Sequence, residues 1–218
     1  GGERAQGVAV DSNGFIYIAG DTTSTNLPVT PGVFQPTYAG GVQDSWVAKL
    51  TPDGQNVVWL SYLGGNNFDR SYTLKVDSAG YVYVDTWTGS SNFPTTVGAY
   101  DRTLGGSSDT AITKITPDGS SIVWSTFIGG SGEEQTRNAM FLNSSGEVYI
   151  SGFTDSTDFP ATNPTIGTRG GQDGFLAKLS ANGSSLIFGT VFGGSGNDLA
   201  QSNMIVHSDG TIYTAGMT

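Results

Sequence analysis

The chain has no cysteine, one histidine and few cationic side chains. Nine Lys and Arg residues stand against 19 Asp and Glu residues, so the formal net charge over 218 residues is −10. Without Cys no disulfide staples the fold, and a single His cannot complete a zinc site or a Ser/His or Cys/His nucleophile pair. The excess of acid argues against nucleic acid as a partner, because phosphate binding needs clustered cations. No apolar run reaches the roughly 18 residues of a membrane span.

Glycine and β-forming residues are abundant instead. The chain has 33 Gly residues and only 13% charged residues, and it is rich in Thr, Ser, Val, Ile and Tyr. This composition favours short strands and tight turns over helices. We therefore expect an all-β protein.

A Gly-Gly step recurs at 64–65, 129–130 and 193–194, at intervals of 65 and 64 residues. A period of this length suits one four-stranded sheet that is stabilised by stacking on its neighbours. The whole chain, 1–218, is then one repeat domain. The predicted units are about 3–65, 66–130, 131–194 and a half unit, 195–218.

Each unit begins with a predicted hairpin, and the first three contain a second one. The turn of the first is Ser12-Asn13-Gly14, a strong hairpin signal because Asn and Gly tolerate positive φ. The predicted first strands are Gly7–Asp11, Thr73–Asp77, Ala139–Asn143 and Asn203–His207, and the last returning strand is Thr211–Ala215. The second hairpins turn at 51–54, 116–119 and 180–183. The connections between the hairpins keep their pattern as well, so we expect them to be packed.

Four-stranded units in series predict the blades of a β-propeller, about three and a half of which lie in this chain. The segments Val8-Ala9-Val10-Asp11, Trp46-Val47-Ala48-Lys49-Leu50 and Ser61-Tyr62-Leu63-Gly64-Gly65 resemble the SBBP β-propeller repeat, a relative of the NHL repeat. The resemblance covers essentially the whole chain. It implies a propeller of about seven blades within a large secreted or cell-surface bacterial protein, in a family whose members mostly have no assigned activity. No secretory leader opens the sequence, so we expect the export signal to lie outside it.

The second unit departs from the pattern. Lys75 and Asp85 stand where the other units have apolar or small residues, and Trp87 is an aromatic outside the repeated register. A Lys on an inner strand is costly unless a carboxylate meets it, and Asp85 on the next strand is the expected partner. The three residues are the candidate ligand contacts. The alternatives are a purely structural ion pair, a position in a solvent-lined channel, and simple exposure at the surface.

One Asp stands just before the third strand in each of the three whole units, each time after a Gly-Gly pair. Asp44, Asp109 and Asp173 could contribute oxygens to a calcium site, although turn-capping hydrogen bonds to backbone N–H groups are the preferred interpretation. No other cofactor is expected. The lone His207 occupies a turn position, and the acidic stretches 133–134 and 197–198 are interpreted as solvated loops. The aromatics in register are assigned to packing between blades; they are Tyr17, Tyr83, Tyr149 and Tyr213, then Trp59, Trp124 and Phe188.

The sequence therefore predicts a non-catalytic extracellular or cell-surface module that binds or scaffolds a protein or glycan partner. One alternative is a self-assembling subunit of a surface filament or layer. Another is an enzyme, a lyase or hydrolase, with its chemistry in the propeller channel at Lys75 and Asp85. The remaining edges of the ring would be covered by further blades of the same polypeptide or by a partner, since open sheet edges are a liability.

Overall fold

A computed structural model describes residues 1–200 and 204–218, and these residues form strands, turns and loops without a helix. Two antiparallel sheets of four strands follow the order of the chain. The first contains β1 (Glu3–Val10), β2 (Ile16–Thr22), β3 (Asp44–Leu50) and β4 (Val57–Leu63). The second contains β5 (Asp69–Val76), β6 (Val82–Thr88), β7 (Asp109–Ile115) and β8 (Ile122–Ile128). The all-β prediction is confirmed, and both sheets are consistent with propeller blades.

The third sheet differs from the prediction because it has a fifth strand. Its antiparallel strands are β9 (Glu134–Leu142), β10 (Val148–Thr154), β12 (Asp173–Leu179) and β13 (Leu186–Gly193). The short β11 (Ile166–Gly167) pairs in parallel with the outer edge of β13. The long connection thus contributes a strand here, where the repeat pattern predicted only a loop.

A separate hairpin follows, formed by β14 (Ile205–Val206) and β15 (Ile212–Tyr213). These strands are shorter than the predicted ones. Position 203, the first residue of the predicted strand, lies outside the described residues. His207 is at the turn as expected: its backbone N–H donates to Thr211 O at 2.9 Å, and its ring lies 5.2 Å from that of Tyr213.

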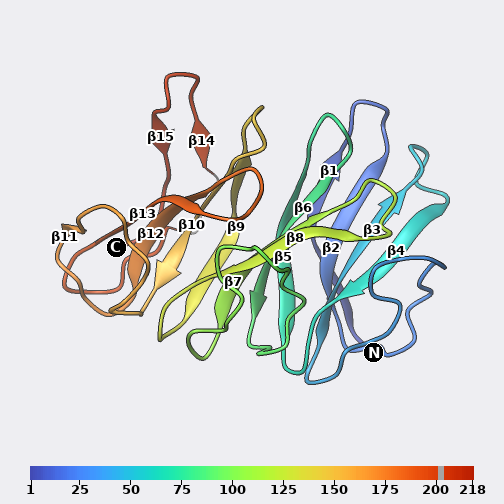
Figure 1. Cartoon of the computed structure of the whole chain (residues 1–218), viewed down its shortest axis with the longest axis horizontal. Helices are drawn as coiled ribbons and strands as arrows, with labels where there is room; N and C mark the ends of the chain where they lie inside the picture. Colours follow the sequence, from blue (N-terminus) through green and yellow to red (C-terminus); the bar gives the residue numbers. More distant parts are fainter. Residues whose placement is uncertain (201–203) are drawn as a thin grey trace.

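The three large sheets lie side by side, and the tips of their first hairpins point to the same side of the molecule (Figure 1). The first strands of successive sheets are neighbours: β1 packs on β5, and β5 packs on β9. Buried apolar side chains from adjacent sheets form one core at each contact. The first core includes Tyr17, Leu63, Leu74 and Phe127, and the second includes Tyr83, Ile128, Ile150 and Phe175.

The hairpin turns form as the sequence predicts. Asp11 accepts hydrogen bonds from the N–H groups of Asn13 at 2.9 Å and Phe15 at 3.0 Å, and Gly14 has a φ of 83°. The first strands begin earlier than predicted, at Glu3 instead of Gly7 in the first sheet. Register shifts at Gln6 and Tyr72 break the apolar alternation there, which hides the start of each strand in the sequence.

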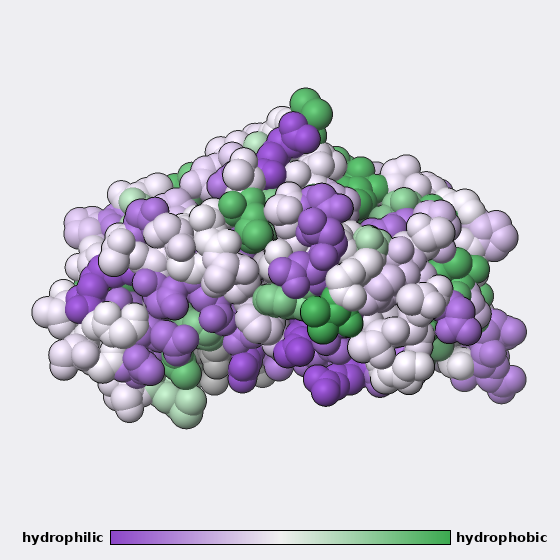
Figure 2. All heavy atoms as spheres, turned by 90° about the horizontal axis from the view of Figure 1, so that it is seen from below, coloured by the Kyte–Doolittle hydropathy of each residue, from purple (hydrophilic) through white to green (hydrophobic). Residues whose placement is uncertain are grey.

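The connections are packed, as expected. Thr30 illustrates this: its N–H donates to Leu60 O at 3.2 Å and its hydroxyl accepts from Leu60 N–H at 3.1 Å, which covers part of the outer edge of β4. The surface seen from below is mostly hydrophilic with small separate apolar groups (Figure 2). None of the residues described forms a helix of the length and apolarity required for a membrane span.

Candidate functional site

The three predicted ligand contacts do not form one site. Lys75 pairs in register with Tyr83, at the hairpin end of β5, whereas Asp85 pairs with Thr73. Among the described residues no ion pair joins Lys75 to Asp85. Lys75 is instead half-buried beside a cavity of about 500 Å³ near the turns of the second and third sheets. The predicted ion pair between Lys75 and Asp85 is wrong, because the register of β5 with β6 places the two residues at different positions along the strands.

Asp85 is buried within the protein and cannot contact a ligand in solvent. One of its oxygens accepts a hydrogen bond from the hydroxyl of Thr136 on β9, and the other, Oδ1, has no partner. Burial raises the pKa of this carboxyl to about 7. Asp85 is therefore an interior carboxylic acid between the second and third sheets. Because it does not meet Lys75, the two residues nominated for a channel enzyme do not form a pair.

Trp87, in contrast, lines an open cleft between the second and third sheets. Its ring lies 4.4 Å from that of Phe68, and its Nε1 donates to Ser108 Oγ at 2.9 Å. The cleft has a volume of about 390 Å³, within the range of ligand-binding pockets. It is lined by Arg70, Tyr72, Trp87, Glu133, Gln135, Arg137, Phe153, Gln172, Leu199 and Met217.

The two arginines of the cleft lie over aromatic rings. The guanidinium carbon of Arg70 is 5.5 Å from the Trp87 ring, and that of Arg137 is 6.0 Å from the Tyr72 ring. Arg137 Nε donates to Gln135 Oε1 at 3.0 Å, and Gln135 Nε2 donates to Tyr72 Oη at 3.1 Å. These contacts hold the two guanidinium groups against the two aromatic rings, which gives the cleft a positively charged surface with flat aromatic faces.

One guanidinium keeps unused donor capacity. Arg70 Nη2 donates to Gln43 Oε1 at 3.4 Å, a long bond, while its Nε is buried without a partner. Buried donors are normally satisfied, so an orphan N–H beside a cleft is a recognised sign of a functional position. Sequence reasoning missed Arg70 because its neighbours follow the repeat pattern.

A local irregularity of β9 presents Arg137. Asn138 has a φ of 57°, the single positive value among the non-glycine residues described, and the pairing of β9 with β10 shifts at this point. Ala139 follows Glu134 by five positions, whereas Thr73 follows Asp69 by four positions in the second sheet. That inserted residue is the sequence signal that could have located the site, since bulges often re-aim side chains beside functional clefts.

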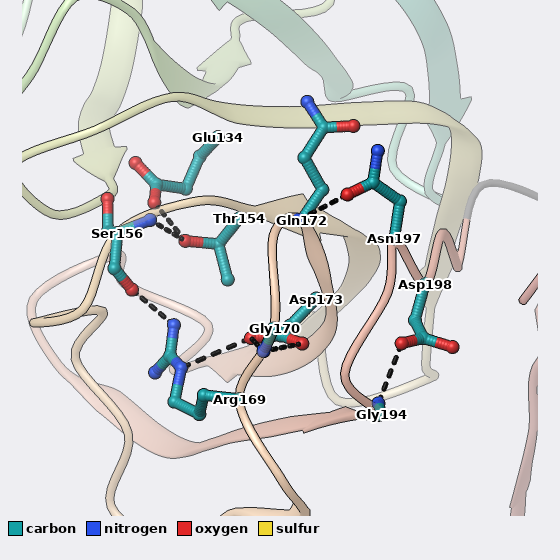
Figure 3. Close-up of polar contacts among 10 residues, drawn as sticks. All are labelled: Glu134, Thr154, Ser156, Arg169, Gly170, Gln172, Asp173, Gly194, Asn197 and Asp198. Atoms are coloured by element: carbon teal, nitrogen blue, oxygen red, sulfur yellow. Dashed lines mark hydrogen bonds and ion pairs between the residues drawn. The ribbon is translucent and has the colours of Figure 1, made fainter.

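The acidic stretch 133–134 is not a pair of solvated loop residues. Glu133 borders the cleft, where burial raises the pKa of its carboxyl and Arg137 opposes the shift. Glu134 is fully buried; it accepts hydrogen bonds from Thr154 Oγ1 and from Gly130 N–H, the latter at 2.9 Å. The interpretation failed because the hydroxyl of Thr154, 20 residues further along the chain on β10, donates to this buried carboxylate (Figure 3).

The three calcium candidates begin β3, β7 and β12 and are buried. Each carboxylate accepts a backbone N–H from the preceding loop: Asp44 from Ala39 at 2.6 Å, Asp109 from Gly105 at 2.8 Å, and Asp173 from Gly170 at 3.1 Å. These bonds match the preferred interpretation, although the donors precede the acids and no Asx-turn is formed. Across the residues described, no group of three or more His, Asp or Glu side chains converges on one point.

Comparison with known families identifies one matching segment. Residues 4–28, which include most of β1 and all of β2, match the SBBP beta-propeller repeat. No curated protein matches the chain. The resemblance stated from the sequence is thus confirmed for the first hairpin, and the stacked four-stranded sheets are consistent with it.

Proposed function

We propose that this chain is part of a non-catalytic propeller module of a secreted or cell-surface bacterial protein, and that it binds an acidic glycan in the cleft beside Trp87. The observation that carries the proposal is the placement of Arg70 and Arg137 over aromatic rings in one open cleft. The chain has only nine basic residues and a strongly acidic surface, so two cations in one cleft are a selective feature for a negative ligand.

The chemistry of the cleft suits a sugar that carries a carboxylate. Arg137 is exposed and presents donors that can contact a carboxylate in a bidentate manner. The half-buried Trp87 supplies flat apolar area, and the half-buried Gln172 adds an amide group, while Tyr72 and Gln135 are buried in the wall of the cleft. These side chains offer donors and flat faces rather than a nucleophile beside a base, which is why the proposal is binding without turnover.

The test is isothermal titration calorimetry with an oligogalacturonate and a neutral galacto-oligosaccharide of equal length. We expect binding of the acidic oligomer alone, weakening as salt is raised. Arg137→Gln should reduce the affinity about tenfold or more, since a charge-assisted hydrogen bond contributes about 1.5–3 kcal/mol. Arg102→Gln, at an exposed position of the connection before β7, is the matched control and should leave binding unchanged.

Two outcomes would overturn the glycan assignment. Binding of a poly-glutamate peptide without binding of the oligogalacturonate would assign the cleft to an acidic protein partner. Equal binding of both sugars, unaffected by Arg137→Gln, would remove the cleft from recognition.

A self-assembling role is the second candidate, and exposed apolar residues at the two ends of the row of sheets favour it. Val8 and Val10 on β1 are exposed, as are Ile205 and Tyr213 of the β14–β15 hairpin. Further blades of the same polypeptide, or another copy of the chain, would bury these side chains. Light scattering separates the cases: a monodisperse monomer at all concentrations contradicts self-assembly.

A further inference from the structure

A cavity of about 500 Å³ lies between the second and third sheets, beside the turns of their first hairpins. It is at the other end of β5 from the cleft: Arg70, near the start of the strand, borders the cleft, and Lys75, near its end, lines the cavity. No described residue lines both spaces. Lys75 and Lys114 both line the cavity, so we call it the lysine cavity. Its volume is within the range of ligand-binding pockets.

Lys114 has a structural counterpart in each of the other two large sheets. A lysine of the third strand pairs in register with a tyrosine of the second strand, and its Nζ lies over that ring. These lysines are Lys49, Lys114 and Lys178, at 5.0, 4.8 and 4.9 Å from the ring centroids of Tyr17, Tyr83 and Tyr149. Packing within the sheet therefore accounts for Lys114.

Lys75 has no such counterpart. It pairs in register with Tyr83, and the same register position holds Ala9 in the first sheet and Phe141 in the third. Phe141 uses this position for packing, with its ring 5.9 Å from that of Tyr149. Among the residues described, no ion pair includes Lys75. This half-buried ammonium is thus a charge that the packing of the sheet does not require.

The wall of the lysine cavity has more positive than negative charge. Among its described lining residues, Asp77 is the one acid that faces Lys75 and Lys114. The carboxylate of Asp77 lies 4.0 Å from Lys114 Nζ, and it also accepts the N–H groups of Ala79 and Tyr81 in its own turn, each at 3.0 Å. Burial lowers the pKa of Lys114 although Asp77 opposes the shift. In a chain with a net charge of −10, such a wall selects for a negative ligand.

The corresponding cavities at the neighbouring contacts lack this arrangement. The cavity between the first and second sheets has a volume of about 140 Å³, and Lys49 meets two acids there, Asp11 and Asp77. The cavity between the third sheet and the last hairpin has about 470 Å³, but none of the described residues that line it is Lys or Arg. Lys75 is therefore what distinguishes the lysine cavity from the other two.

We propose that the lysine cavity binds a small solute that carries a tetrahedral oxyanion, namely a phosphate or sulfate ester. An ammonium group binds such an anion as a compact point charge, without the planar fork by which arginine matches a carboxylate. Ser144 and Ser145, exposed on the facing turn, add hydroxyl groups that can donate to its oxygens. The volume leaves room for more than a bare ion, which favours a sugar-sized ester. The site goes beyond the proposed function of the cleft, because it uses none of the same residues.

Calorimetry at constant ionic strength with inorganic phosphate, galactose 6-phosphate, galactose 6-sulfate, galacturonate and neutral galactose tests this. We expect the two esters to bind most tightly. Lys75→Ala, which introduces the residue of the first sheet, should weaken their binding about tenfold or more, whereas Lys75→Arg should retain most of it because the charge remains. Arg102→Gln removes the same charge at an exposed position and is the control. Arg137→Gln should leave this binding unchanged, which separates it from binding in the cleft.

The thermal midpoint gives a second readout, since a bound ester should raise it in the wild type and much less in Lys75→Ala. Phosphate and sulfate also stabilise proteins by exclusion from their surface, and that effect should be equal in all variants. Near-UV circular dichroism verifies that each variant is folded. Ester binding that is absent from the wild type, or unchanged in Lys75→Ala, would overturn the proposal. Galacturonate binding that is equally tight and equally dependent on Lys75 would overturn the tetrahedral preference, and equal affinity for inorganic phosphate would overturn the assignment to an ester.

Discussion

The indole Nε1 of Trp59 donates a hydrogen bond to the carbonyl oxygen of Pro117, 3.1 Å away in the second-hairpin turn of the next sheet. The contact recurs one sheet further, where Trp124 Nε1 donates to Ala181 O at 3.0 Å. The outer strands of the first two sheets, β4 and β8, therefore each hold the neighbouring sheet through a part-buried polar bond within an apolar contact. The assignment to packing between units is confirmed for Trp59, Trp124, Tyr17 and Tyr83, which belong to the cores between sheets. Tyr149 and Phe188 contact each other within the third sheet, and Tyr213 is 58% exposed.

Replacing Trp59 by Phe should keep most of the packing and remove the bond to Pro117. We expect a loss of about 1 kcal/mol in the free energy of unfolding, and about 3–5 kcal/mol for Trp59→Ala, which also opens a cavity. Urea unfolding measures both. Val97→Ala, at a side chain that is 89% exposed, is the control. If Trp59→Phe is as stable as the wild type, the hydrogen bond to Pro117 contributes nothing to stability.

The turn glycine under Trp59 provides a sharper comparison. Gly119 has a φ of 70°, and a methyl group on it would lie 2.6 Å from the Trp59 ring. Gly98 has a φ of 84° but open space around it. Gly98→Ala should cost about 1 kcal/mol from the backbone alone, and Gly119→Ala about 1–3 kcal/mol more because of the clash. Equal losses in urea unfolding would contradict the packing account.

Asp85 should make the stability of the protein depend on pH. The folded-state pKa of about 7 exceeds the unfolded value of about 4, so between these limits the folded chain retains a proton that the unfolded chain has released. Stability from this group is therefore fully present below about pH 4 and is lost as pH rises through about 7. Asp85→Asn removes this contribution while keeping an acceptor for Thr136.

We expect Asp85→Asn to match the wild type near pH 4 and to exceed its stability by up to about 4 kcal/mol near pH 8, from three pKa units at about 1.4 kcal/mol each. Urea unfolding across this range measures the difference. Burial also raises the pKa values of Asp44 and Asp109 to about 7, so the variant should keep part of the wild-type slope. A difference that does not change with pH would contradict the burial of a protonated Asp85.

The sequence predicted the repeat and its hairpins because they depend on local chemistry. The turn at Gly14 needs positive φ, and a strand with one apolar face shows alternating apolar and polar residues in the sequence. The cleft depends on contacts between residues far apart, such as Gln135 with Tyr72. Trp87 was found because it broke the register, whereas Arg137 required counting one inserted residue. The burial of Glu134 could not be predicted, since the hydroxyl groups that satisfy it come from another strand.

The positive φ of Asn138 gives a last prediction, which concerns the insertion that presents Arg137. Glycine adopts this conformation freely, whereas a β-branched side chain at positive φ is strained. Asn138→Gly should therefore be neutral or slightly stabilising, and Asn138→Val should cost about 1–2 kcal/mol in urea unfolding. The glycine variant should keep the affinity of the cleft for an acidic oligosaccharide. Deletion of Asn138 should weaken that affinity, because the four-residue spacing of β5 would be restored and Arg137 would leave the ring of Tyr72. A valine variant as stable as the wild type would show that β9 does not hold the backbone in this conformation.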